Sequence, residues 1–309
     1  MNATPPLNIH VVDSFTDRPF GGNPAGVCLL PAGPWPEDQW MRRIAAEMNH
    51  SETAFALPSA AGADADWSIR WFTPLVETNL CGHATLATRH VLRTERGLLG
   101  PIRFSSRWNG VLVAEADADG TVVLDFPAAP GTRVPVPEGL AEALGVAPEA
   151  TFRTGALGDL LTVLPDEASV RAVTPDLAAL AELTRAEELR GVIITARAAG
   201  ADGEHGSAYD TEHGAEYDFV SRFFSPSEGI PEDPVTGSAH TALAPYWSDR
   251  LGRESLTGLQ ASARAGLVRT VVLGDRVRLS GSAVTILSGT LGESAARGCG
   301  PGGGVDQQR

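Results

Sequence analysis

Cysteine is scarce in this sequence, and positive charge is scarcer than negative charge. The three cysteines, Cys28, Cys81 and Cys299, are far apart and form no Cys-x-x-Cys pair, which argues against a disulfide framework or a zinc cluster. The 24 Lys and Arg residues face 38 Asp and Glu residues, so the net charge is −14. Nucleic acids and anionic membrane surfaces attract positive proteins, so we expect neither as a partner.

Long apolar runs are also missing. No stretch of about 18 apolar residues occurs, and the first residues lack the basic region and apolar run of a signal peptide. We therefore expect no membrane span and a reducing, cytoplasmic location. With 43% hydrophobic and 20% charged residues, the composition is that of a globular protein with a sizeable core. A length of 309 residues suits two domains.

One sequence plan occurs twice, about half of the chain apart. Arg70 to Pro74 and Arg222 to Pro226 each read Arg, two aromatic residues, a hydroxyl residue and Pro. Each copy then crosses an acidic stretch and reaches a small polar signature, Gly82 to Thr85 in the first copy and Gly237 to His240 in the second. An internal duplication explains this repeat most simply.

Each signature precedes an apolar stretch that we predict to be helical, over residues 84–93 and 238–251. The amides of a helix's first turn carry partial positive charge, and glycine lets a ligand approach them closely. Two such helix starts would hold a small carboxylate. Alternatively they are ordinary loop-to-helix junctions, since Gly-Ser and Gly-His are common there. The duplication, with His83 and Asp233 at matching places, favours the binding site.

A proline-rich segment over residues 127–137 predicts the boundary between the halves. We expect an N-terminal domain over 1–127, a C-terminal domain over 128–292 and a flexible tail over 293–309.

Residues 198–218 are polar and lack apolar periodicity, so we predict an exposed loop there. The loop contains His205 and His213 among glycines and acids, and we expect no metal site from them.

Two carboxylates stand at places where chemistry is possible. Pro234 disfavours a helical backbone at Asp233, so this side chain can point toward the Gly-Ser amides that follow. Glu52 comes just after a predicted helix and heads a predicted strand. Taken alone, each residue fits a structural role equally well: Asp233 as a turn residue and Glu52 as a capping or surface residue.

Four motifs together resemble the phenazine-biosynthesis PhzF-like proteins. They are Gly-Gly-Asn-Pro-Ala-Gly-Val (21–27), Ser-Glu-Thr-Ala-Phe (51–55), Phe-Thr-Pro followed by Cys-Gly-His-Ala-Thr-Leu (72–86), and Glu-Asp-Pro-Val-Thr-Gly-Ser-Ala-His (232–240). The resemblance covers roughly residues 7–292. It implies an α+β protein with the diaminopimelate epimerase-like fold, in which two pseudo-symmetric domains each wrap a curled, mostly antiparallel sheet around a central helix. The active site of that fold lies between the domains.

The resemblance also implies roles for individual residues. Glu52 falls on the family's general acid/base, and His83 and Asp233 fall on its substrate-holding residues. The remaining substrate-binding candidates are Asn23, Cys81, Gly82, Thr236, Gly237 and Ser238. In the family's founding reaction the glutamate moves a proton between carbons of trans-2,3-dihydro-3-hydroxyanthranilate without a cofactor. One carboxylate in an apolar site can do this, because desolvation raises its pKa toward neutrality.

The resemblance therefore implies a cofactor-independent isomerase of a small carboxylic acid, without a metal and acting as a homodimer. Two alternatives stay open. Related racemases use two cysteines, one before each helix; here those positions hold Cys81 and Thr236, a pair that is similar to the hydroxyproline dehydratases and leaves a dehydratase or epimerase possible. A binding protein without catalysis is the other alternative.

Overall fold

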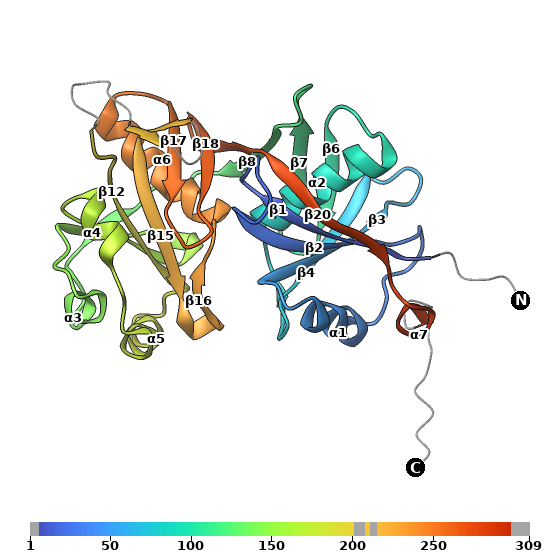
Figure 1. The fold of residues 1–309 in the computed structure, drawn as a ribbon, viewed down its shortest axis with the longest axis horizontal. Helices are drawn as coiled ribbons and strands as arrows, with labels where there is room; N and C mark the ends of the chain where they lie inside the picture. The colour runs from blue at the N-terminus through green and yellow to red at the C-terminus, as the bar shows by residue number, and fades with distance from the viewer. Residues whose placement is uncertain (1–5, 201–207, 211–214, 298–309) are drawn as a thin grey trace, which may run out of the picture. The chain divides into compact units, whose positions relative to one another are not determined.

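The computed structural model describes residues 6–200, 208–210 and 215–297. The chain divides into two compact units, coloured along the chain in Figure 1. Unit 1 takes in Met1–Asp13, Pro24–Val122 and Ala283–Arg309, and unit 2 takes in Ser14–Asn23 and Val123–Ser282. Each unit therefore includes a segment from the opposite half of the chain. The domains predicted from the sequence, 1–127 and 128–292, are contiguous and do not include this exchange.

Unit 1 is a mixed sheet with one amphipathic helix and one buried helix. Strand β3 pairs in parallel with β2 and antiparallel with β4, which pairs in parallel with β6; β6 and β7 are antiparallel. The elements of unit 1 are β1 (Asn8–Ser14), β2 (Asn23–Leu29), α1 (Asp38–Met48), β3 (Glu52–Pro58), β4 (Trp67–Phe72), β5 (Glu77–Thr78), α2 (Gly82–Arg96), β6 (Ile102–Ser106), β7 (Gly110–Ala116), β20 (Ala283–Thr290) and α7 (Glu293–Ala296).

The two longer helices of unit 1 pack differently. Helix α1 is amphipathic and buries Met41 and Ile44 in a cluster that includes Phe55 and Phe72. Helix α2 is buried along most of its length, as its apolar sequence predicts for a central helix. Figure 1 shows α1 and α2 on opposite sides of β2 and β4. Helix α2 ends at Gly97, whose left-handed φ of 63° is typical of a C-cap.

Unit 2 is also a mixed, mostly antiparallel sheet. Strand β12 pairs in parallel with β11 and antiparallel with β15, which pairs in parallel with β17. The elements of unit 2 are β8 (Val122–Pro127), β9 (Thr132–Val134), α3 (Leu140–Leu144), β10 (Ala150–Arg153), the short 3-10 helix η1 (Gly155–Leu157), β11 (Asp159–Val163), α4 (Glu167–Ala172), α5 (Leu177–Ala186), β12 (Gly191–Arg197), β13 (Ala208–Asp210), β14 (Ala215–Tyr217), β15 (Phe219–Ser225), the 3-10 helix η2 (Pro226–Glu228), β16 (Ile230–Asp233), α6 (Gly237–Leu251), β17 (Ser255–Gln260), β18 (Gly266–Leu273) and β19 (Arg276–Gly281).

Helix α6 is the central helix of unit 2. Its Leu243 and Trp247 pack with Ile193 and Phe219, and the Trp247 ring stacks on Phe219 at 5.9 Å between centroids. Alternate residues of β12 enter a different cluster, built with α3, α4 and α5. The sheet therefore has α6 on one face and the three short helices on the other, because side chains alternate along a strand. Among the described residues, no helix is long and apolar enough to cross a membrane.

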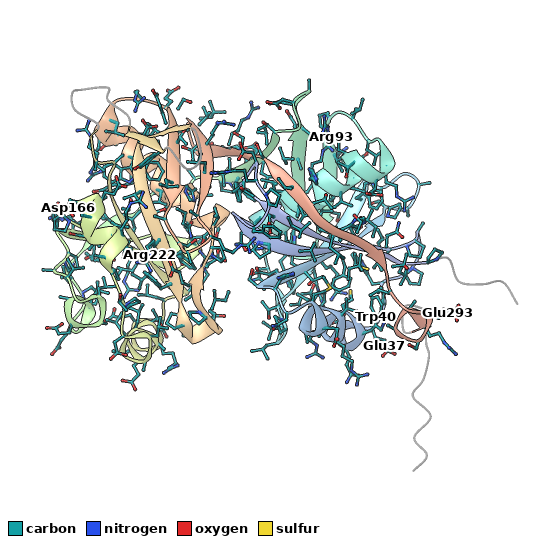
Figure 2. The ribbon with its side chains drawn as sticks, viewed as in Figure 1. Glu37, Trp40, Arg93, Asp166, Arg222 and Glu293 are labelled. Carbon is teal, nitrogen blue, oxygen red and sulfur yellow. The ribbon has the colours of Figure 1, made fainter. Side chains whose placement is uncertain are left out.

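The repeated sequence plan occupies equivalent places in the two units. Arg70 on β4 forms a double hydrogen bond with Glu77, and Arg222 on β15 forms one with Glu232; the Nε–Oε1 distance is 2.7 Å in both. Each guanidinium also lies over the aromatic ring two residues later in the chain, at 5.1 Å and 4.9 Å. The Arg-aromatic-aromatic pattern therefore fixes the strand that leads to each central helix (Figure 2 labels Arg222).

The prediction of an exposed loop over residues 198–218 is wrong at its C-terminal end. Strands β13 and β14 pair as an antiparallel ribbon. Tyr217 and Asp218 are buried, and the Tyr217 hydroxyl donates to Glu167 at 2.8 Å. Aromatic burial at the end of a polar stretch left no periodic signal in the sequence. His205 and His213 lie outside the described residues.

The first residues of the predicted flexible tail are ordered. Residues Glu293–Ala296 form α7, and the indole of Trp40 on α1 donates to the carbonyl of Ala295 at 2.8 Å (Figure 2). Ala296 is buried in the same cluster as α1. The remainder, residues 298–309 with Cys299, lies outside the described part of the chain.

A tight loop precedes Asn23 and depends on glycine. Gly22 has φ of 60°, and a Cβ atom there would lie 2.1 Å from the carbonyl oxygen of Ser14. The Gly22 amide donates to the carbonyl of Ala265 at 2.7 Å, and Arg264 donates to the carbonyls of Gly21 and Gly22. The backbone, rather than any ligand, therefore accounts for the second glycine of the Gly-Gly-Asn-Pro motif.

We predict that Gly22→Ala lowers the free energy of unfolding by about 2 kcal/mol or more, because it adds both a steric clash and left-handed strain. Denaturant unfolding measures this change. Gly292→Ala is the matched control, since a Cβ at Gly292 meets nothing within 4 Å and its φ is −58°. Equal stability of the two variants would contradict the explanation.

Candidate functional site

The first group of predicted residues gathers at the N-terminus of α2 in unit 1. We call Glu52, Cys81, Gly82 and His83 the α2 cluster. Glu52 is the first residue of β3, Cys81 is the N-cap of α2, and Gly82 and His83 are the first two helical residues. The Cys81 Sγ lies 3.4 Å from His83 Nδ1, and Glu52 Oε2 lies 3.5 Å from His83 Nε2. The imidazole thus stands between a thiol and a carboxylate.

His83 is neutral at physiological pH. Burial, with a smaller contribution from the nearby His50, lowers its pKa to about 3. The contact with Glu52 is therefore a long hydrogen bond and not an ion pair. A neutral imidazole has one N–H, and the tautomer with the proton on Nε2 satisfies both neighbours: Nε2 donates to Glu52, and Nδ1 accepts from the thiol of Cys81.

The α2 cluster also has the residue types of a metal site. One ligand atom from each of Glu52, Cys81 and His83 lies within 4.8 Å of the others. The Cys81 Sγ lies 3.4 Å from Nδ1 and 3.9 Å from Nε2, and the Glu52 carboxylate lies 3.5 Å from Nε2. These distances are compatible with an ion as well as with hydrogen bonds among the three side chains. That the protein uses no metal and no cofactor stays a prediction.

The start of α2 presents backbone donors. Cys81 makes no side-chain cap bond to its helix, so the first-turn amides are not used by their own N-cap. The Thr85 hydroxyl donates to the Cys81 carbonyl at 2.6 Å and fixes the N-cap residue. Gly82 adds no side chain in front of these amides, which is the arrangement expected for holding an anion.

The second group gathers at the N-terminus of α6 in unit 2. We call Asn23, Asp233, Thr236, Gly237 and Ser238 the α6 cluster. The carboxylate of Asp233 accepts a hydrogen bond from Asn23 Nδ2 at 2.8 Å and another from the Thr236 hydroxyl at 2.5 Å. Asn23 also donates to the carbonyl of Val235 at 2.8 Å. Asn23 therefore holds the loop of Asp233 in addition to the carboxylate itself.

Burial dominates the protonation of Asp233. It raises the pKa of Asp233 to about 6, although the hydrogen bonds from Thr236 and Asn23 and the charge of Arg190 lower it. At pH 7 the ionised form still prevails, since two donors face the carboxylate. Asp233 is thus a buried carboxylate that takes up a proton near neutrality.

Sequence reasoning missed Gln260, which braces the α6 cluster from β17. Its Oε1 accepts from the Thr236 amide at 2.8 Å, and its Nε2 donates to the Asp233 carbonyl at 2.8 Å. His240, one turn into α6, is buried and neutral, because burial lowers its pKa to about 4. Its Nδ1 donates to the Thr236 carbonyl at 2.9 Å. Both residues hold the helix start in place. No local pattern identifies a glutamine that acts from another strand.

Sequence reasoning also missed Arg190 and Asp159. Arg190 precedes β12 and binds the fully buried carboxylate of Asp159 through Nε and Nη2, at 2.8 and 2.5 Å. Its Nη1 donates to the Ser238 hydroxyl at 3.0 Å. The repeat spacing of 152 residues would place the counterpart of Glu52 at residue 204, so no signal in the sequence indicated Arg190.

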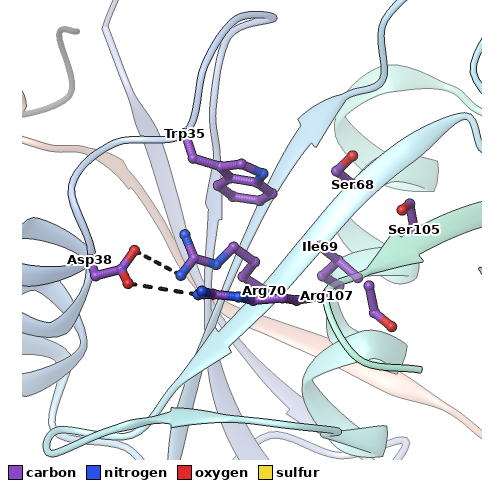
Figure 3. A pocket seen from close by; sticks show the side chains of 8 residues that line it. Trp35, Asp38, Ser68, Ile69, Arg70, Ser105 and Arg107 are labelled. Carbon is purple, nitrogen blue, oxygen red and sulfur yellow. Dashed lines mark hydrogen bonds and ion pairs between the residues drawn. The ribbon is translucent and has the colours of Figure 1, made fainter. Parts of the chain in front are cut away.

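A pocket of about 390 Å³ lies elsewhere in unit 1 (Figure 3). Its walls include Trp35, Asp38, Arg70 and Arg107, and none of the predicted site residues. In Figure 3 the carboxylate of Asp38 reaches both arginines. Glu77 pairs with the same two arginines, so the charges of this pocket satisfy one another. Arg70 has the structural role shared with Arg222, and we assign the pocket no ligand.

The structure thus brings the predicted residues together as two groups. Glu52, Cys81, Gly82 and His83 meet within unit 1, and the remaining five meet within unit 2.

Comparison with known proteins identifies the family of the chain. The phenazine biosynthesis-like protein family, PhzC-PhzF, matches residues 12–289. An uncharacterized isomerase of Pseudomonas aeruginosa is 44% identical over 286 residues, covering 92% of this chain and 98% of the relative.

Solved structures support the fold. A PhzF family protein of Enterococcus faecalis aligns with a TM-score of 0.80 and 36% identity, covering 93% of this chain and 99% of that chain. A predicted epimerase from Pseudomonas aeruginosa, at 20% identity, shares the fold with a TM-score of 0.67 and covers 92% and 99% of the two chains. The expected fold class is confirmed, and the chain belongs to the phenazine biosynthesis-like protein family.

Proposed function

We propose that this protein is a cofactor-independent isomerase of a small carboxylic acid and that Glu52 is its acid/base. The observation that carries the proposal is the Glu52 carboxylate, 13% exposed, beside the neutral imidazole of His83 at the start of α2. The description of the Pseudomonas aeruginosa relative as an isomerase supports the class of reaction. The proposal includes the expected homodimer and cytoplasmic location.

In the proposed reaction Glu52 removes a proton from a carbon next to a conjugated system. The electron pair of that C–H bond forms a new double bond, and the pair of the old double bond takes a proton at its far carbon. Glu52 returns this proton, so no atom or electron is gained or lost. His83 holds the carboxylate in place because its neutral ring donates a hydrogen bond without neutralising the charge.

Thr236 supports this reaction better than it supports a Cys/Thr dehydratase. Its hydroxyl donates to Asp233 and accepts from Gln260 Nε2 at 3.2 Å, so both of its functions are used within the α6 cluster. A hydroxyl held in this way is poorly suited to relay protons to a substrate. The dehydratase and a purely binding role remain as outcomes of the experiment below.

Proton exchange in deuterium oxide tests the proposal. The protein is incubated with a panel of small cyclic or unsaturated acids, including dihydro-hydroxyanthranilate and hydroxyproline, and followed by NMR. We expect a double-bond shift without added cofactor, with deuterium at the new C–H position or with the original proton returned. Loss of water identifies the dehydratase, label at an inverted α-carbon identifies an epimerase, and no exchange with any acid favours a binding protein.

We predict that Glu52→Gln keeps the fold and ligand binding while turnover falls by about 10²–10⁴-fold, because the amide cannot accept the proton. Steady-state rates on the substrate found in the exchange experiment measure the loss. Glu37→Gln, an exposed carboxylate of the same unit, is the control and should keep its activity. Near-normal turnover by Glu52→Gln would remove Glu52 from the mechanism.

Cys81→Ala should retain most of the activity if the thiol only packs against His83. A thiol that reacts must be reachable and partly ionised, whereas Cys81 is 5% exposed and lies against a neutral imidazole. Turnover and circular dichroism of Cys81→Ala are compared with those of Cys28→Ala, which removes a fully buried thiol from β2. A folded Cys81→Ala protein without activity would favour a thiol mechanism.

Asp233 makes a pH-dependent contribution to stability. Its folded pKa, about 6, lies above the reference value of 3.8, so the folded state binds the proton more tightly than the unfolded state. The stability that this proton provides is present below about pH 4 and is lost as the pH rises through 6. We predict that Asp233→Asn gains stability relative to wild type between these limits, as urea unfolding at pH 4.5 and 7 measures. A constant difference across this range would refute the assignment.

A further inference from the structure

Strand registers show which residue of unit 2 corresponds to Glu52. Thr53 pairs with Phe72 in unit 1, and Val192 pairs with Phe224 in unit 2. Since Phe72 and Phe224 hold the same place in the repeated plan, the residue before Thr53 corresponds to the residue before Val192. Glu52 therefore corresponds to Gly191.

A second pair of registers aligns the neighbouring strands. Ala25 on β2 pairs with Glu52, and Asp159 on β11 pairs with Gly191, both in parallel ladders. The same alignment places Arg190 at the position of Ser51. Arg190 and Asp159 therefore lie at strand ends of unit 2 that are equivalent to the strand ends around Glu52 in unit 1.

Gly191 cannot carry a side chain in this structure. A Cβ there would lie 2.5 Å from the Phe223 ring and 2.7 Å from the Phe224 carbonyl oxygen. Unit 2 therefore has no second acid at the strand head. The charged residue at this strand end is instead Arg190, which precedes Gly191 and carries a positive charge where unit 1 has the negative charge of Glu52.

Arg190 is held from several sides. Its amide donates to the Gly158 carbonyl at 2.7 Å, and its carbonyl accepts from the Ser225 hydroxyl at 2.5 Å. Its guanidinium binds Asp159 through two nitrogens and lies over the Phe223 ring at 5.1 Å. Such a bidentate pair on an aromatic face fixes the direction of the third nitrogen, Nη1.

The third nitrogen meets the same helical position that Glu52 meets in unit 1. Glu52 contacts His83, the second residue of α2, and Arg190 donates to Ser238, the second residue of α6. A hydroxyl oxygen that accepts from a guanidinium directs its own proton elsewhere. Ser238 is half-buried, so a ligand at the start of α6 can accept that proton.

We propose that Arg190, fixed by Asp159, is a positioning residue that makes Ser238 a hydrogen-bond donor to a carboxylate of the ligand. Asp159 takes up the charge of Arg190, and the group offered to the ligand is the oriented hydroxyl of Ser238. This inference rests on the proposed function, because it assumes that the α6 cluster binds the same carboxylic acid. It assigns the selectivity for a carboxylate to two residues outside the sequence motifs, Arg190 and Asp159.

Anthranilate and its uncharged analogue anthranilamide are the probes for this inference, with binding measured by calorimetry or NMR titration. Wild type should bind anthranilate more tightly than anthranilamide. Arg190→Lys should weaken anthranilate binding about 10-fold, since lysine keeps a charge near Asp159 but lacks the fork that reaches Ser238, and should change anthranilamide binding less than about 2-fold. Ser238→Ala should cause the same selective loss without disturbing the buried pair.

A double-mutant cycle and a control complete the test. If Arg190 acts through Ser238, the double variant loses no more than either single variant. Arg222→Lys changes the other bidentate arginine of unit 2 and should leave the anthranilate preference unchanged. Equal loss of both probes in Arg190→Lys, additive losses in the cycle, or no preference in wild type would overturn the inference.

The outcome is separable from that of the proposed function. Glu52→Gln should keep the anthranilate preference, since Glu52 belongs to unit 1 and to the proton-transfer step. If the preference depends on Arg190 and Ser238 while no acid undergoes exchange, the proposed isomerisation fails and the carboxylate site stands. If exchange depends on Glu52 but the preference does not depend on Arg190, the isomerase stands and this inference fails.

Discussion

A buried carboxylate must be hydrogen-bonded, and the start of α6 is organised by that requirement. Asp233 is 6% exposed, and each of its oxygens accepts from a neighbouring side chain, Asn23 or Thr236. Asn23 reaches it only because Gly22 turns the preceding loop, and Thr236 is held by Gln260 from β17. Residues from three separate parts of the chain thus hold the Asp233 carboxylate in place: Gly22 with Asn23, Thr236, and Gln260. Such a fully satisfied network specifies one arrangement of the loop.

The two units use one framework for groups of opposite charge. In both, an arginine paired with a glutamate fixes the strand that leads to the central helix, and the second residue of that helix meets a charged group from a neighbouring strand end. That group is a carboxylate in unit 1 and a guanidinium in unit 2. Gly191 leaves no room for a counterpart of Glu52 in unit 2, and Thr236 stands at the helix start where unit 1 has Cys81. This asymmetry is consistent with a single proton-transfer group.

Much of the fold was predictable because its signals are local. The central helices expected over 84–93 and 238–251 extend over Gly82–Arg96 and Gly237–Leu251, and both are buried over most of their length. The grouping of Glu52 with His83 followed from the family resemblance. Gln260 and Arg190 could not be found in this way, since each acts through contacts between strands that are distant in sequence. The prediction of an exposed loop was wrong at residues 215–218 for a related reason. The burial of Tyr217 depends on Glu167, which is 50 residues away.

The residue at position 236 shows how a site keeps its geometry while its chemistry changes. A cysteine at this helix start would offer a thiol, which is a weak hydrogen-bond donor. The Thr236 hydroxyl donates to Asp233 at 2.5 Å and accepts from Gln260, which a thiol would do poorly. Burial alone pushes Asp233 toward its neutral form, so it stays ionised at pH 7 only if strong donors face it. Thr236 therefore supplies one of the two donors that keep Asp233 ionised and fixed at the start of α6.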